Sequence, residues 1–116
     1  MNEKRFDLTD RLEDFAASII LVYDQKPMSY AGDYLAKQLI RSSCSSALNY
    51  GEVLGAGTEK DKINKLRIVL KELRESLRNL NIQTKAKLMP IDSLNVFKDE
   101  NDQLIRIIVT RIKNIN

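Results

Sequence analysis

Residues 38–52 contain the densest group of side chains that could do chemistry, in the sequence QLIRSSCSSALNYGE. Four serines lie in this stretch beside one cysteine, one asparagine and one glutamate. A serine becomes a nucleophile when a nearby base takes its proton. Because the chain has no histidine, that base would be a lysine or a carboxylate, such as Lys37 or Glu52. An enzyme that uses Ser45 or Glu52 is therefore one hypothesis, although no spacing selects a base for either residue.

The same stretch also has a structural interpretation, which we favour. A helical stripe starts at Leu35 and continues at spacings of four, three, four and three through Leu39, Ser42, Ser46 and Asn49, so its last three members are small polar residues. Serine and asparagine compete with helical backbone hydrogen bonds, so their place on a buried face indicates a close helix contact or a polar network. We expect Arg41, Asn49 and Glu52 to form hydrogen bonds between helices. Together with two serines they make up the predicted helix-packing network: Arg41, Ser42, Ser45, Asn49 and Glu52.

A second candidate is a row of cations, the basic stripe, which consists of Arg67, Lys71, Arg74 and Arg78. Each follows a leucine by one position, so on a helix the stripe lies about 100° round from those leucines. A basic face of this kind is typical of binding to nucleic-acid phosphates, strongest at low salt and indifferent to base sequence. The alternative is a solvated flank whose charges pair with Glu72 and Glu75 for little energy.

Composition narrows the chemistry further. A chain of 116 residues has single-domain length. The absence of histidine removes the commonest nitrogen ligand for metals, and we expect no cofactor. The single cysteine, Cys44, cannot form an internal disulfide, which fits a reducing compartment, and we interpret it as a small buried hydrophobe. Aromatic residues make up 6% of the chain, so base-specific recognition by stacking is not expected.

Charge and hydropathy indicate a basic, cytoplasmic protein. Residues 1–57 hold six Lys/Arg against eight Asp/Glu, and residues 58–116 hold thirteen against eight, which gives −2 and +5 and sums to the net charge of +3. The longest apolar run near the start, residues 15–23, is interrupted by Ser18 and is too short to span a bilayer. No signal peptide is evident, so we expect a soluble cytoplasmic protein with no membrane partner.

Four helical segments must position these residues. They are expected at about residues 8–24, 29–54, 58–87 and 91–115, with breaks at the two prolines and at residues 55–57, Gly-Ala-Gly. N-caps are expected from Asp7 or Thr9, from Ser29 and from Thr58.

The third segment has the strongest periodicity, a seam of Ile63, Leu66, Leu70, Leu73, Leu77 and Leu80. The fourth has the stripe Leu94, Phe97, Leu104, Ile108, Ile112 and Ile115, interrupted by Asn101. This pattern predicts an all-α, up-down-up-down four-helix bundle.

Several short motifs between residues 38 and 75 resemble those of one known family, and the resemblance extends over nearly the whole chain, from about Phe6 to Ile115. They are Gln38 to Ser42, then Ser45, Ala47, Asn49 and Glu52, then residues 59–61 (EKD), 64–65 (NK) and 70–75 (LKELRE). In this order they are similar to the bacterial four-helix-bundle proteins first noticed as open reading frames in intervening sequences of 23S ribosomal RNA genes. The chain departs from many relatives at Lys62, where they place an aromatic residue, so we do not expect a packing contact of that aromatic here.

The resemblance implies a four-helix bundle that assembles into a homopentamer, with no established activity. A related branch, the accessory variability proteins of diversity-generating retroelements, forms basic pentamers that bind nucleic acid and a reverse transcriptase. By this analogy we expect a non-enzymatic oligomeric module that contacts RNA or DNA through non-specific phosphate contacts of the basic stripe. The alternative is a protein–protein adaptor with no nucleic-acid role, whose arginines bridge subunits or bind an acidic partner.

Overall fold

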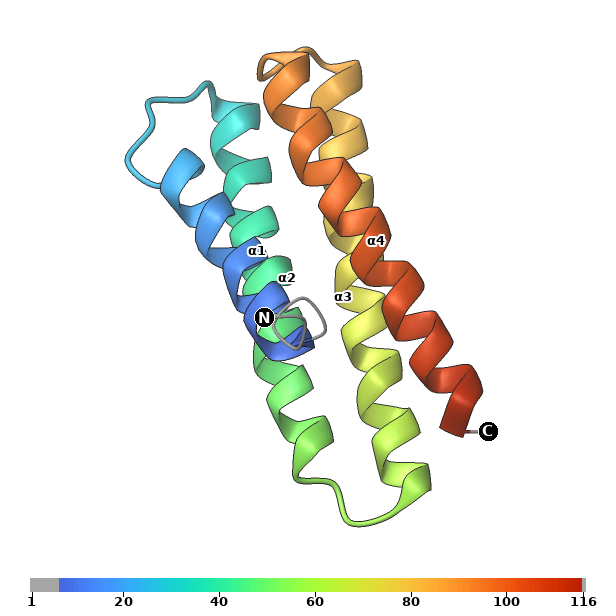
Figure 1. Cartoon of the computed structure of the whole chain (residues 1–116). Coiled ribbons are helices and arrows are strands. Elements are labelled where there is room, and N and C mark those ends of the chain that lie inside the picture. Colours follow the sequence, from blue (N-terminus) through green and yellow to red (C-terminus); the bar gives the residue numbers. More distant parts are fainter. Residues whose placement is uncertain (1–6, 116) are drawn as a thin grey trace.

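The computed structural model describes residues 7–115, which form four α-helices. Their bounds are Leu8–Tyr23 for α1, Tyr30–Leu54 for α2, Glu59–Lys85 for α3 and Ile91–Ile115 for α4. Consecutive helices run in opposite directions, and α2 packs along α3 while α4 packs on the other side of α3 (Figure 1). The predicted all-α class with four helices is confirmed, and every helix end lies within two residues of the predicted one.

Local chemistry accounts for the helix ends. Three side chains cap helices by accepting a backbone N–H three residues on: Asp7 from Asp10 at 3.2 Å, Ser29 from Gly32 at 3.1 Å and Thr58 from Asp61 at 3.1 Å. Such a cap stabilises its helix by about 1 kcal/mol. At the other end of α3, Lys87 has φ of 56°, in the left-handed region. The helix therefore stops at Lys85 and not at the predicted residue 87, since a left-handed residue cannot continue it.

The core lies along the seam of α3. Leu66, Leu70, Leu73 and Leu80 are buried there. Full burial of such a side chain contributes about 1.5–3 kcal/mol. Asn101 of α4 is also fully buried, and with its amide oriented to satisfy both polar atoms it donates to the Leu73 carbonyl at 3.0 Å and accepts from the Leu77 N–H at 3.1 Å. The polar interruption predicted in the α4 stripe is therefore a contact with the backbone of α3.

The first helix is much shorter than the others. It has 16 residues, whereas α4 has 25, and it begins part-way along the bundle (Figure 1). The C-terminal end of α4 therefore extends past the start of α1 (Figure 1), and Ile112 and Ile115 are only partly buried. Within residues 7–115, none of the helices combines the length and the apolar character that a membrane crossing requires.

Candidate nucleic-acid interface

The serine-rich stretch lies at the contact between α2 and α3. Ser42, Ser43 and Ser46 are fully buried. The Oγ of Ser42 lies 2.6 Å from the Oγ of Ser76 on α3, and Ser46 donates to the backbone of its own helix at 2.7 Å. Because these side chains are small and their hydroxyls are bonded, α2 can lie close to α3 without leaving polar groups unpaired.

Charged residues on either side of the serines also join the two helices. Arg41 forms ion pairs with Glu72, at 3.3 Å, and with Glu75. Partial burial is the largest single influence on the pKa of Arg41 and lowers it, but the hydrogen bonds and charges of Glu75 and Glu72 together raise that pKa above its ordinary value. Glu52 accepts from Lys65 of α3 at 2.7 Å.

Within residues 7–115, Asn49 bonds inside α2 and not between helices, so the prediction that it would join two helices is wrong. Its amide donates to the backbone carbonyl of Ser45 at 2.9 Å and to the Ser45 Oγ at 3.0 Å, both within α2. This i,i+4 geometry satisfies a half-buried amide locally. Ser45 therefore faces an amide and not a base, and Glu52 is engaged by Lys65. The free thiol of Cys44 is half-buried nearby.

A second polar chain, which is not among the predicted contacts, joins α1, α2 and α3. The Tyr23 hydroxyl donates to the Gln83 oxygen at 2.6 Å, the Gln83 amide donates to Asn79 at 2.8 Å, and the Asn79 amide donates to the Leu35 carbonyl at 2.9 Å. Burial raises the pKa of the Tyr23 hydroxyl above its ordinary value. The signal in the sequence was the spacing of Ser76, Asn79 and Gln83, three and four residues apart beside the leucine seam.

The basic stripe lies on the outward face of α3. Arg67, Lys71, Arg74 and Arg78 are all exposed, and none of them forms an ion pair with another residue of the described part, 7–115. The pairing of the stripe with Glu72 and Glu75, considered above, is therefore contradicted. Those two carboxylates point to the other side of α3 and bind Arg41.

Two further lysines extend the stripe. Lys60 lies seven residues before Arg67, and Lys85 lies seven residues after Arg78. At about 100° per residue, all six cations fall within an arc of about 60° on α3. Both lysines are exposed, and neither has an ion-pair partner among the described residues. The six-residue row, which comprises these lysines and the basic stripe, thus runs the whole length of the helix.

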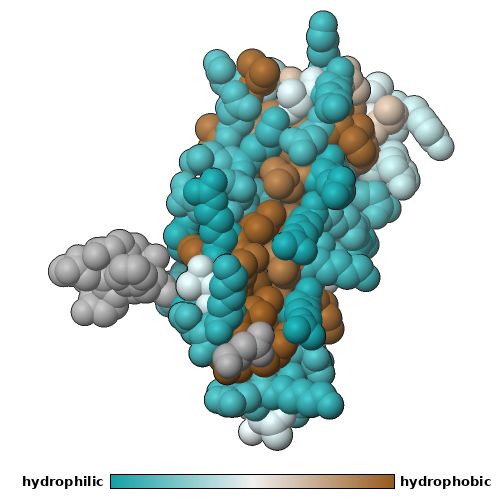
Figure 2. All heavy atoms as spheres, turned by 90° about the vertical axis from the view of Figure 1, so that its right-hand side faces the viewer, coloured by the Kyte–Doolittle hydropathy of each residue, from teal (hydrophilic) through white to brown (hydrophobic). Residues whose placement is uncertain are grey.

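An apolar groove lies beside the row, between α3 and α4. It has a volume of about 420 Å³ and is lined by Arg67, Leu70, Lys71, Arg74, Val109, Ile112 and Lys113. Figure 2 views the side of the molecule on which α3 and α4 lie and shows a strip of hydrophobic atoms with hydrophilic side chains on both sides. The site therefore combines unpaired positive charge with an aliphatic floor.

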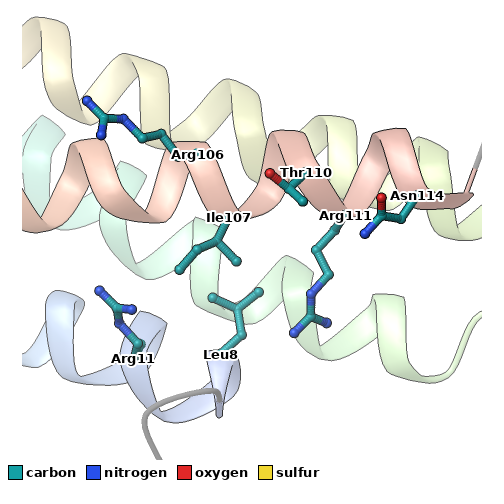
Figure 3. A pocket seen from close by; sticks show the side chains of 7 residues that line it. All are labelled: Leu8, Arg11, Arg106, Ile107, Thr110, Arg111 and Asn114. Atoms are coloured by element: carbon teal, nitrogen blue, oxygen red, sulfur yellow. The ribbon is translucent and has the colours of Figure 1, made fainter.

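A second pocket lies between α1 and α4, and its arginines, unlike those of the six-residue row, are engaged by other side chains. It holds about 440 Å³, and Leu8 and Ile107 point toward one another across it (Figure 3). Its arginines have partners: Arg11 pairs with Glu100 at 2.7 Å, Arg106 pairs with Asp102 at 2.7 Å, and Arg111 donates to the hydroxyl of Tyr50 at 3.0 Å. Of the two sites, the groove beside the six-residue row is the one that leaves several cations free for a ligand.

Comparisons with known proteins agree with the fold. A family model described as 23S rRNA-intervening sequence protein matches residues 4–110. No curated protein matches the chain. A crystal structure of a protein of unknown function from the S23 ribosomal protein family of Bacteroides thetaiotaomicron superposes with a TM-score of 0.80 at 25% sequence identity, over 91% of this chain and 98% of that one.

Proposed function

The chain belongs to the 23S rRNA-intervening sequence protein family, and we propose that it is a non-enzymatic, oligomeric module that binds nucleic acid through the outward face of α3. The observation that carries the proposal is the state of the basic stripe. Arg67, Lys71, Arg74 and Arg78 are exposed and have no ion-pair partner in residues 7–115, while the nearest acidic residues of α3 are bound by Arg41.

The expected ligand chemistry is the phosphate backbone. Cations that neutralise phosphates release bound counterions, so the logarithm of affinity falls with the logarithm of salt concentration by about 0.7–0.9 for each phosphate contacted. Exposed arginines and lysines on one helix face supply such contacts without recognising bases. The low content of aromatic residues, 6%, fits a ligand that is bound without regard to sequence.

Assembly belongs to the same proposal. We expect copies of the chain to form a ring, with the pentamer implied by the resemblance as the expected size. A ring repeats the basic face around its axis, and several weak contacts to one nucleic acid then combine into a stronger one through effective concentration. Light scattering coupled to size exclusion measures the mass directly. A monomeric mass at all protein concentrations would contradict the proposed assembly. The binding of nucleic acid by the outward face of α3 would then be tested separately.

The binding face is tested with labelled RNA and duplex DNA, titrated at several salt concentrations. The variant Arg67→Glu with Arg74→Glu places two repulsive charges in the stripe, and we expect it to bind about 100-fold more weakly at low salt. The matched control is Lys26→Glu with Lys37→Glu, which makes the same change in net charge at exposed positions outside α3. We expect this control to retain most of the affinity.

Two outcomes would contradict the proposal. One is an absence of binding by the unchanged protein even at low salt. The other is an equal loss in the stripe variant and the control variant, which would mean that net charge and not the face determines binding. In either case the remaining explanation of the exposed cations is an adaptor that binds an acidic protein or bridges subunits.

A further inference from the structure

The length and straightness of the six-residue row suggest what kind of nucleic acid it fits. Lys60 and Lys85 are 25 residues apart, which corresponds to about 37 Å along a helix that rises 1.5 Å per residue. Between these ends the cations follow at steps of seven, four, three, four and seven residues. Because they share one narrow arc of α3, they form a line parallel to the helix axis.

A straight line of cations suits a flexible strand better than a duplex. In a duplex each backbone winds around the axis, so a straight row meets phosphates only where a strand crosses it. A single strand has no fixed path and can follow the row from end to end. Sites for one strand of nucleic acid commonly cover about 4–16 nucleotides in a positively charged groove.

The floor of the groove between α3 and α4 supports the same choice. Leu70, Val109 and Ile112 form an aliphatic surface directly beside Arg67, Lys71 and Arg74. A duplex presents sugars and phosphates on its outside and would leave this surface unused. The unpaired bases of a single strand have apolar faces that can lie against it, and such contact tolerates any sequence because every base has such a face.

Resting on the proposed function, we infer that the ligand is a single strand of RNA or DNA, with its phosphates along the six-residue row and its bases against the floor of the α3–α4 groove. The groove reaches only the middle of the row, since it is lined on α3 by residues 67–74. Bases are therefore held near the centre of the site, and the outer cations at Lys60 and Lys85 hold phosphates alone.

The alternative occupant of the groove is an acidic amphipathic helix of a protein partner, because such a helix also combines negative charge with an apolar face. Such a helix would seat in the groove and contact the cations at its edge. It would gain little from cations that lie well beyond the groove at both ends. The single strand uses all six, and for this reason it is the favoured occupant.

The test is a competition on the full chain. An unstructured mixed-sequence DNA 20-mer carries the label, and the competitors are the same strand unlabelled, its duplex with the complement, and an acidic amphipathic Leu/Glu peptide. We expect the single strand to compete about tenfold better than the duplex at equal phosphate concentration, a difference of about 1.4 kcal/mol.

The floor is tested by one substitution made at two places on α4. Val109→Ser removes an apolar contact from the groove, and Val96→Ser makes the same change at a side chain that is 69% exposed and lies outside it. We expect only Val109→Ser to weaken single-strand binding, about threefold, and to leave duplex binding unchanged. Since Val109 also packs against the core, Val109→Thr, which keeps the shape of the side chain, is measured beside it.

Each outcome decides a different point. Equal competition by duplex and single strand, or equal effects of the two valine changes, would overturn the inference and leave the proposed function intact. Binding of neither nucleic acid at low salt would overturn the proposed function itself. Stronger competition by the peptide, lost in Val109→Ser and in Val109→Thr, would overturn the inference in favour of a protein partner.

Discussion

The two long faces of α3 differ in whether their charged side chains form ion pairs with the described residues, 7–115. On the face toward α2, Glu72 and Glu75 bind Arg41, and Lys65 binds Glu52. On the outward face, the six-residue row has no ion-pair partner among residues 7–115. The helix carries eight Lys/Arg and four Asp/Glu, so its excess positive charge is gathered on one side. The comparison indicates that the inner face organises the bundle and the outer face is available to a ligand.

Energetics explain how both faces coexist on one helix. Exposed ion pairs contribute only about 0.2–1 kcal/mol, so leaving surface cations unpaired costs the fold little. What the unpaired row adds is a positive field that attracts anions and raises their rate of association. Buried hydroxyls at the inner face have no such freedom, because an unbonded polar group in a core costs about 1–3 kcal/mol.

The largest effect is expected from neutralising the outer face. Changing Arg67, Lys71, Arg74 and Arg78 together to glutamine should lower affinity for nucleic acid at low salt by more than about 100-fold and reduce the slope of log affinity against log salt by about 3. The melting temperature should stay almost unchanged, because surface substitutions of this kind alter stability by about 0.5 kcal/mol at most. Binding titrations and calorimetry on one preparation measure both. A large fall in melting temperature would mean that the outer face also holds the fold together.

The next effect is expected at the inner face. Ser42→Leu places three more carbons where the hydroxyl of Ser76 lies 2.6 Å away. Overpacking costs about 1–3 kcal/mol, and we expect the melting temperature to fall by about 5–10 °C. The control is Ser18→Leu, at an exposed position of α1. If Ser42→Leu melts no earlier than this control, the helices are not closely packed at the serines.

A smaller effect is expected at alkaline pH from the polar chain that joins α1 to α3. Tyrosine titrates at about pH 10 in an unfolded chain, and burial raises the pKa of Tyr23 in the fold. The folded protein therefore keeps this proton to higher pH than the unfolded chain. The stability that depends on it is fully present below about pH 10 and is lost as pH rises through the raised pKa.

Denaturant unfolding between about pH 8 and pH 11 measures this loss, and Tyr23→Phe should reduce it. At pH 8 the same change should cost about 1 kcal/mol, because the hydrogen bond to Gln83 is removed. Tyr34→Phe is the control, since Tyr34 is 58% exposed. An identical pH profile for the two variants would show that the Tyr23 proton does not contribute to alkaline stability.

Features that depend on neighbours along the chain could be predicted from the sequence. The leucine seam of α3 and the caps at Ser29 and Thr58 follow from helical periodicity and from side chains that reach three residues on. The sequence also contains the extension of the basic stripe to Lys60 and Lys85. These two lysines lie seven residues from the ends of the stripe, whose own members are only three or four residues apart. These signals are local, so one sequence is enough to reveal them.

Partners between helices could not be predicted in the same way. Ser76 opposite Ser42, and Gln83 beneath Tyr23, depend on how far each helix is rotated and shifted along its neighbour. Periodicity states which face is buried but not which residue it meets. The wrong expectation for Asn49 has this origin, because a half-buried amide can be satisfied equally well by its own helix. Periodicity identifies Asn101 as an interruption of the α4 stripe, but only the structure shows its contact with the backbone of α3.

The smallest effect tests whether the two faces of α3 are independent. Arg41→Ala removes the partner of Glu72 and Glu75, so two carboxylates on α3 are no longer neutralised. Stability should fall by less than about 1 kcal/mol, since the pair is partly exposed. Affinity for nucleic acid should fall about twofold to threefold at low salt and recover at higher salt, because the released charges act on the row only through a screened field. Lys37→Ala, at an exposed ion pair on the same helix, is the control. If both variants bind alike, the charges facing α2 do not influence the outer face, and the arrangement of Arg41 serves packing alone.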